Sequence, residues 1–98
     1  MKPCLSEEKH QHTASLARGK VLDIGFATKP NAYLRGAYGV DIQQAPRPKN
    51  YAAVYVCNLN TDPLPFPDSS FDTVIMDDTI EHVENPTAVL LEIYRVLK

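Results

Sequence analysis

Lys20-Val-Leu-Asp-Ile-Gly25 is the segment that most clearly indicates the fold of this chain. Three of its residues, Val21, Leu22 and Ile24, are apolar and nearly continuous. Such a run is typical of a strand that is buried on both faces, as strands of parallel sheets are. The stretch therefore predicts the first strand of an α/β sheet, with a turn beginning at Gly25.

Three further apolar stretches, residues 37–42, 53–57 and 71–76, predict strands that join the first one. The segments between them are long enough to cross over a sheet. Strands that alternate with crossover segments indicate a mostly parallel sheet, here of about four strands, flanked by helices.

Two helices are expected at the ends of the chain. Residues 6–18 predict a polar helix, and residues 86–98 predict an amphipathic helix with Pro86 in its first turn. Residues 26–36 are expected to form a turn and a short helix. Two proline-containing stretches, 43–50 and 58–70, are expected to be loops.

The composition limits the class of protein. The chain has 98 residues, enough for one small domain, and 44% of them are hydrophobic. Its formal net charge is −2, and no run of Lys and Arg suggests binding to nucleic-acid phosphates. No apolar run is long enough to span a membrane, and the polar residues 1–12 lack a signal-peptide core, so we expect a cytoplasmic protein.

The cysteines and histidines give no sign of a metal site. Cys4 and Cys57 stand far apart, and neither belongs to a Cys-x-x-Cys pair or lies near a histidine at metal-binding spacing. His10 and His12 are two residues apart on the expected helix, so they face apart. We expect free thiols, since a disulfide is unusual in a cytoplasmic chain, and no bound metal.

Four segments, in this order, carry a resemblance to a known family: Val21-Leu-Asp-Ile-Gly25, Gly39-Val-Asp41-Ile42, Leu64-Pro-Phe-Pro-Asp-Ser-Ser-Phe-Asp-Thr-Val74, and Ile80-Glu-His82-Val-Glu-Asn-Pro86 leading into Glu92-Ile-Tyr-Arg-Val-Leu-Lys98. Through them the chain resembles the class I S-adenosylmethionine (SAM)-dependent methyltransferases, in particular the type 11 group. The resemblance implies a Rossmann-like fold. It makes residues 20–98 a truncated SAM-binding domain, an incomplete version of the family's seven-stranded sheet. Residues 1–19 lie outside the resemblance and are expected to form an N-terminal polar helix or tail.

The resemblance also implies which residues hold SAM or its product S-adenosylhomocysteine (SAH), beyond the carboxyl ends of the strands. Gly25 corresponds to the family's cofactor turn, and Asp41 to its ribose-binding acid, although both residues also fit ordinary turns. Asn58 or Asn60 corresponds to the adenine-binding position, and the sequence leaves open which. The expected cofactor-binding residues are Asp23, Gly25, Phe26, Ala27, Lys29, Asp41, Ile42, Asn58, Leu59, Asn60, Asp77 and Asp78.

Three of the candidate residues follow the fourth strand. The resemblance places Asp77 and Asp78 beside the methionine part of the cofactor and the substrate, but adjacent carboxylates are equally common in solvated loops. His82 is the candidate for a general base, because histidine titrates near neutral pH. The resemblance favours a structural or pocket-lining role for it instead.

The chain departs from the family in two places. The family's Gly-x-Gly-x-Gly loop reads Gly25-Phe-Ala-Thr-Lys29 here, so Ala27 and Lys29 replace two glycines. The positive charge of a lysine repels the sulfonium and ammonium groups of SAM, but it attracts the carboxylate. The family also continues past the position of Lys98 into a fifth strand. We therefore expect an open edge on the fourth strand and self-association through it.

These features predict methyl transfer from SAM to an unknown acceptor, by direct displacement at the sulfonium methyl. The alternative is a non-catalytic module that keeps a nucleoside or SAM site and lacks the substrate half. Lys29 and the missing strands favour that alternative. An NAD-binding domain is disfavoured, because the Gly-x-Gly-x-x-Gly pattern is absent.

Overall fold

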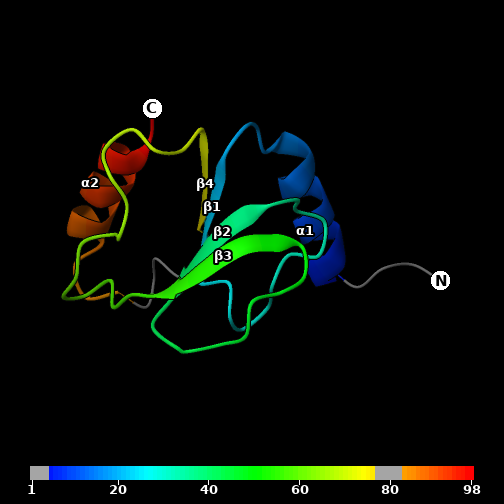
Figure 1. Ribbon diagram of the computed structural model, residues 1–98, viewed down its shortest axis with the longest axis horizontal. Coiled ribbons are helices and arrows are strands. Elements are labelled where there is room, and N and C mark those ends of the chain that lie inside the picture. Colours follow the sequence, from blue (N-terminus) through cyan, green and yellow to red (C-terminus); the bar gives the residue numbers. More distant parts are fainter. Residues whose placement is uncertain (1–4, 77–82) are drawn as a thin grey trace.

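The computed structural model describes residues 5–76 and 83–98, and it shows one sheet between two helices (Figure 1). The elements are α1 (Leu5–Leu16), β1 (Val21–Ile24), β2 (Ala37–Asp41), β3 (Tyr51–Val56), β4 (Thr73–Met76) and α2 (Pro86–Val96). All strand pairs are parallel, and the strand order is β3-β2-β1-β4. The predicted fold class, a parallel α/β sheet flanked by helices, is confirmed. No helix in the described part of the chain is long and apolar enough to cross a membrane.

Strand β1 lies between β2 and β4, and every one of its residues is buried. Its side chains alternate between the two faces of the sheet. Leu22 and Ile24 belong to a core cluster that includes Val96 of α2. Val21 belongs to a second cluster, against which Ala14 of α1 packs. The two helices therefore cover opposite faces of the sheet (Figure 1).

Several element ends differ from the predicted ones. β3 begins at Tyr51 rather than at residue 53, and β4 begins at Thr73 rather than at residue 71. Phe71 instead forms an isolated parallel bridge to Leu97, whose extended backbone ends α2. Within residues 5–76 and 83–98 no strand pairs with the outer edge of β4. Self-association through that edge stays a prediction.

Residues 26–36 form turns and bends rather than the predicted short helix. Asn31 explains much of the difference, because its side-chain oxygen accepts the N–H of Tyr33 at 3.0 Å and closes a tight turn. The side-chain amide of Asn50 donates to the carbonyls of Asn31 and Leu34, both at 2.9 Å. The carbonyls of Asn31 and Leu34 are thus held by a side chain of another segment, in place of backbone N–H groups farther along a helix.

Gly39 of β2 makes room for Phe26, which reaches into the core from the turn after β1. The Phe26 side chain is 2% exposed, and its ring centroid lies 5.7 Å from that of Tyr51. A Cβ atom on Gly39 would stand 2.7 Å from Cδ1 of Phe26 and 2.9 Å from Cγ. Any larger residue at position 39 would therefore push against a packed ring.

We predict that Gly39→Ala lowers the free energy of unfolding by about 1–3 kcal/mol, because the new methyl group overpacks the core. The φ angle of Gly39 is not positive, so the loss measures the clash and not backbone strain. Chemical denaturation of wild type and variant measures it. In a Phe26→Leu background, which makes room, the same change should cost less. An equal cost in both backgrounds would contradict the clash.

Candidate functional site

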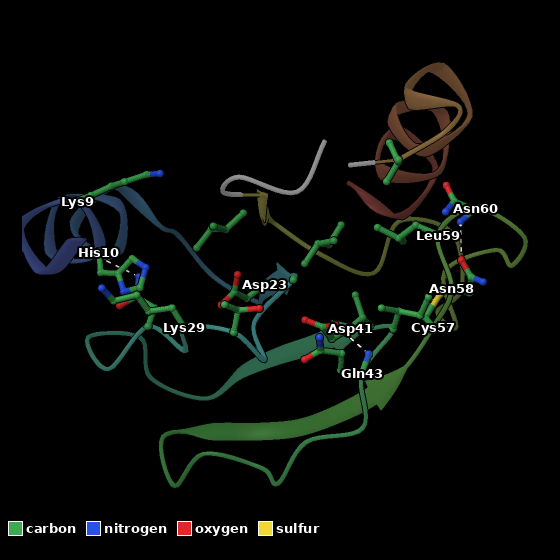
Figure 2. Close-up of a pocket in the computed structure, with 18 residues that line it drawn as sticks. Lys9, His10, Asp23, Lys29, Asp41, Gln43, Cys57, Asn58, Leu59 and Asn60 are labelled. Atoms are coloured by element: carbon green, nitrogen blue, oxygen red, sulfur yellow. Dashed lines mark hydrogen bonds between the residues drawn. The ribbon is translucent and has the colours of Figure 1, made fainter. Parts of the chain in front are cut away.

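A pocket of about 570 Å³ opens at the carboxyl ends of β1, β2 and β3 (Figure 2). Its size lies within the range of small-molecule sites, roughly 300–1,000 Å³. The structure brings most of the predicted cofactor residues together in its lining: Asp23, Gly25, Lys29, Asp41, Ile42, Asn58, Leu59 and Asn60. They come from three separate stretches of sequence, which meet because parallel strands end at the same edge of a sheet.

Gly25 carries the chain from β1 into the wall of the pocket. Its φ angle is 83°, a left-handed conformation that glycine adopts without a steric penalty. Its N–H donates to the carbonyl of Val40 at 2.8 Å, so the residue is still tied to β2. The turn thus presents backbone to the pocket from a fixed position.

Asp41 ends β2, and two backbone N–H groups hold its carboxylate. Oδ2 accepts from Ala27 at 3.0 Å, and Oδ1 accepts from Gln43 at 2.9 Å. Ala27 was predicted to bind the cofactor, but it is not among the lining residues and acts here through its backbone. Each carboxylate oxygen can accept a further hydrogen bond. The group is therefore oriented and still able to receive ligand hydroxyls.

The loop after β3 forms another wall of the pocket, and its two asparagines make different hydrogen bonds. Asn58 Oδ1 accepts the N–H of Asn60 at 3.0 Å, which closes a tight turn. Asn60 Oδ1 accepts the N–H of Glu84 at 2.8 Å, which joins the loop to the segment before α2. Leu59, between them, gives the pocket an apolar surface.

Cys57 is a buried free thiol in the same wall. Its N–H donates to the carbonyl of Asp41 at 2.9 Å, which extends the pairing of β2 and β3 past the end of β3. Burial raises the pKa of the thiol, and the charges of Asp62 and Glu92 raise it further. Cys57 is therefore protonated at neutral pH and is not an activated nucleophile.

A buried polar chain links β1 to β3 at the pocket. Asp23 is 6% exposed, Asn31 is 3% exposed and Tyr51 is 1% exposed. The Tyr51 hydroxyl donates to Asp23 Oδ2 at 2.5 Å and accepts from the backbone N–H of Asn31 at 3.0 Å. Burial, followed by the Asp23 charge and its hydrogen bond, raises the pKa of Tyr51. The hydroxyl therefore keeps its proton at neutral pH.

Part of α1 also reaches the pocket, which the sequence did not predict. Lys9 and His10 line it near Lys29, on the side opposite Asn58 (Figure 2). The helix is polar with little amphipathic pattern, so the sequence carries no signal for the face that meets the pocket. The side-chain amide of Asn31 holds α1 there by donating to the His10 carbonyl at 3.0 Å. Other polar lining residues outside the predicted set are Thr28, Asn31 and Gln43.

The remaining predicted residues do not join this group. Phe26 packs in the core, because Gly39 leaves space for its ring there, and it is absent from the lining. Asp77, Asp78 and His82 lie outside the described residues, so their roles stay predictions. Among the residues that are described, no group of three or more His, Cys, Asp or Glu side chains is arranged to hold a metal ion.

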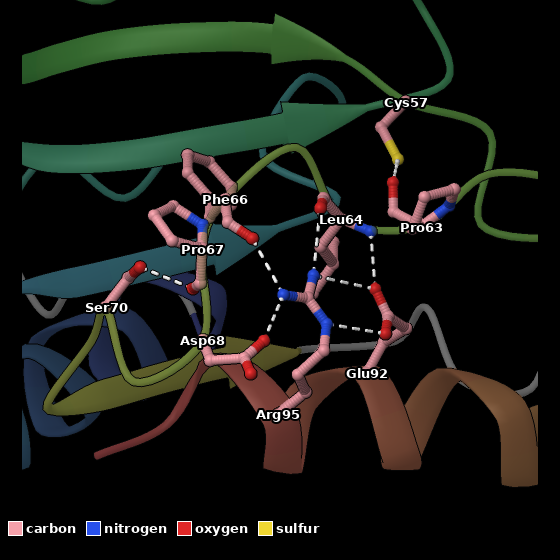
Figure 3. A network of polar contacts seen from close by, with 9 residues as sticks. All are labelled: Cys57, Pro63, Leu64, Phe66, Pro67, Asp68, Ser70, Glu92 and Arg95. Carbon is pink, nitrogen blue, oxygen red and sulfur yellow. Dashed lines mark hydrogen bonds and ion pairs between the residues drawn. The ribbon is translucent and has the colours of Figure 1, made fainter.

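Arg95 of α2 holds the loop that leads from the pocket back to β4 (Figure 3). Its guanidinium donates to the carbonyls of Leu64 at 3.0 Å and Phe66 at 2.9 Å, and to the carboxylate of Asp68 at 2.8 Å. Glu92 completes the network by accepting from Arg95 Nε at 2.8 Å and from the Leu64 N–H at 2.8 Å. One turn of α2 thus fixes a proline-rich loop that has no regular structure of its own.

The model of a type 11 family, described as a methyltransferase domain, matches residues 22–98 of the chain. Among the curated proteins, none matches the chain significantly.

Solved structures share the fold. The YcgJ protein from Bacillus subtilis matches with a TM-score of 0.70 at 26% identity, over 95% of this chain and 46% of that one. The [4+2]-cyclase SpnF matches with a TM-score of 0.68 at 20% identity, over 95% and 40% of the two chains. A chain of the Haloferax volcanii complex that contains the Trm112 methyltransferase activator matches at 0.66 and 21%, over 95% and 49%. The present chain spans less than half the length of each.

We predict that Arg95→Ala lowers the free energy of unfolding by about 1–3 kcal/mol, because charged partners and carbonyls of the loop lose their donor. Arg35→Ala is the matched control, since Arg35 is exposed. It should change stability by less than about 0.5 kcal/mol. Urea denaturation measures both variants, and similar losses in the two would contradict the role of the Arg95 network.

Glu92 should contribute to the pH dependence of the free energy of unfolding. The hydrogen bond from Arg95 lowers the pKa of Glu92 below its ordinary 4.5; burial opposes this shift, and the Leu64 N–H and the charge of Arg95 support it. A carboxyl whose pKa is lower in the folded than in the unfolded protein stabilises the fold. This stabilisation is fully present above the pKa of the unfolded protein, and it is lost as the pH falls through the pKa of the folded protein. We predict that Glu92→Gln loses less stability than wild type between about pH 5 and about pH 3. Identical acid profiles in denaturation experiments would refute this.

Proposed function

The chain belongs to the type 11 methyltransferase-domain family, and from this we propose that its pocket binds SAM and SAH for the transfer of a methyl group to an acceptor. The observation that carries the proposal is the Asp41 carboxylate, held by two backbone N–H groups at the wall of the pocket. The end of a β-strand in a doubly wound sheet is where an acidic residue meets a ribose diol.

The chemistry of the pocket fits the other parts of the cofactor. Ile42 and Leu59 offer apolar surface to an adenine ring, and the Asn58 amide offers polar groups to its edge. The Asp23 carboxylate suits the ammonium group of the methionine part. Lys29 suits its carboxylate, so a lysine in place of a glycine is compatible with binding. These assignments divide the pocket into a nucleoside side and an amino-acid side (Figure 2).

When bound, SAM supplies a methyl group activated by a positively charged sulfur. The residues of this chain contribute binding and orientation: Asp41 and the loop after β3 hold the nucleoside, and Asp23 and Lys29 hold the amino-acid part. Holding a donor in line with an acceptor supplies much of the rate of such a displacement, so no covalent intermediate with the protein is required.

A second candidate is a module that binds SAM or a nucleoside without transferring a methyl group. Lys29, which lines the pocket at a family glycine position, favours it. The shared fold of the cyclase SpnF is a further reason not to equate fold with methyl transfer. A module that binds SAM has the same cofactor binding as the methyltransferase and differs from it in turnover, so release of SAH from SAM on adding acceptors separates the two candidates.

We predict that the 98-residue chain binds SAH saturably and that Asp41→Asn weakens binding by about tenfold or more, because the ribose loses a charged acceptor. Isothermal calorimetry measures both affinities. Asp68→Asn removes the same charge from a carboxylate outside the pocket lining. It should bind within about twofold of wild type, since exposed charges are screened. No saturable binding at millimolar SAH would overturn the proposed function.

A further inference from the structure

The hydrogen bonds of Tyr51 fix the direction of its hydroxyl proton. The Tyr51 oxygen accepts the backbone N–H of Asn31 at 3.0 Å, and it lies 2.5 Å from Asp23 Oδ2. An N–H group can only donate, and a phenol has a single proton. The proton therefore points at Asp23, and Oδ2 of Asp23 is an acceptor.

Small residues of β2 allow this contact across the sheet. Tyr51 of β3 is in register with Ala37, and Asp23 of β1 is in register with Gly39. Ala37 and Gly39 lie on the same face of β2, so little side-chain volume stands between the two polar residues. The phenol ring can thus extend over β2 and place its hydroxyl at β1.

The ring is held independently of its hydroxyl. Tyr51 is 1% exposed and packs against Phe26 with ring centroids 5.7 Å apart. Asp23 lines the pocket, whereas Tyr51 is not among the lining residues. Any effect of the Tyr51 hydroxyl on a ligand must therefore pass through the lining residues that it binds, Asp23 and Asn31, and of these two Asp23 carries the charge that an ammonium group would meet.

We infer that Tyr51 is a positioning residue, whose hydroxyl orients the Asp23 carboxylate to receive the ammonium group of a ligand's amino-acid part. The inference rests on the proposed function, because that function supplies the ligand. A carboxylate left without this donor would lose one of the contacts that hold it in the wall of the pocket, and hydrogen bonds to charged groups are among the stronger ones.

The test compares two ligands in Tyr51→Phe, which keeps the packed ring and removes only the hydroxyl. SAH carries an ammonium group, and 5′-methylthioadenosine lacks the whole amino-acid part. We expect SAH affinity to fall by about tenfold, the value of one hydrogen bond to a charged group, and methylthioadenosine affinity to stay within about twofold. Tyr55→Phe is the control, because Tyr55 lies on the same strand, is 42% exposed and packs on Phe66. It should change neither affinity.

A double-mutant cycle with Asp23→Asn supplies a readout that general destabilisation does not change. If Tyr51 acts through Asp23, then Tyr51→Phe adds less than about a twofold loss of SAH affinity in the Asp23→Asn background. Fully additive losses, or equal losses for SAH and methylthioadenosine, would overturn the inference and leave the proposed function standing. A wild-type chain that binds neither ligand would overturn the proposed function and the inference together.

Discussion

Strand β1 pairs with β2 on one edge and with β4 on the other, and all of its residues are buried. Its backbone groups form hydrogen bonds with both neighbouring strands, but its side chains must be buried on both faces of the sheet. The clusters that include residues of α1 and α2 provide that cover. The central place of β1 also positions the pocket. β2 and β3 continue the parallel sheet beside β1, so their carboxyl ends lie next to Gly25, which follows β1.

The burial of β1 makes Asp23 an exception within it. A charged residue in a central strand costs free energy unless hydrogen bonds replace its water. Tyr51 supplies one, across two small residues of β2, and Asn31 in turn donates to Tyr51. Central buried strands normally consist of apolar residues, and β1 departs from this rule at the pocket. Functional sites are where such departures are expected.

Membership of the family and the shared fold do not by themselves define the chemistry. The chemistry depends on the side chains at the strand ends, and different hydrogen bonds hold the loops that carry them. Gly25 is tied to β2, and Asp41 is held by two backbone N–H groups. The loop after β3 is held by Asn60 near the pocket and by Arg95 farther along. The pocket is therefore built from separately anchored loops on one sheet edge.

The amino-acid sequence alone predicted the parallel sheet, its approximate strands and the candidate residues at strand ends, including Gly25, Asp41 and Asn58. Apolar periodicity and strand ends are local features, because each depends on residues that are neighbours in the sequence. Tertiary contacts were needed to establish that Phe26 packs in the core and that residues 26–36 form turns. They also established that α1 lines the pocket and that Tyr51 reaches Asp23. Apart from the turn that Asn31 closes with Tyr33, these outcomes depend on contacts between residues distant in the sequence, and no local pattern records which distant groups will meet.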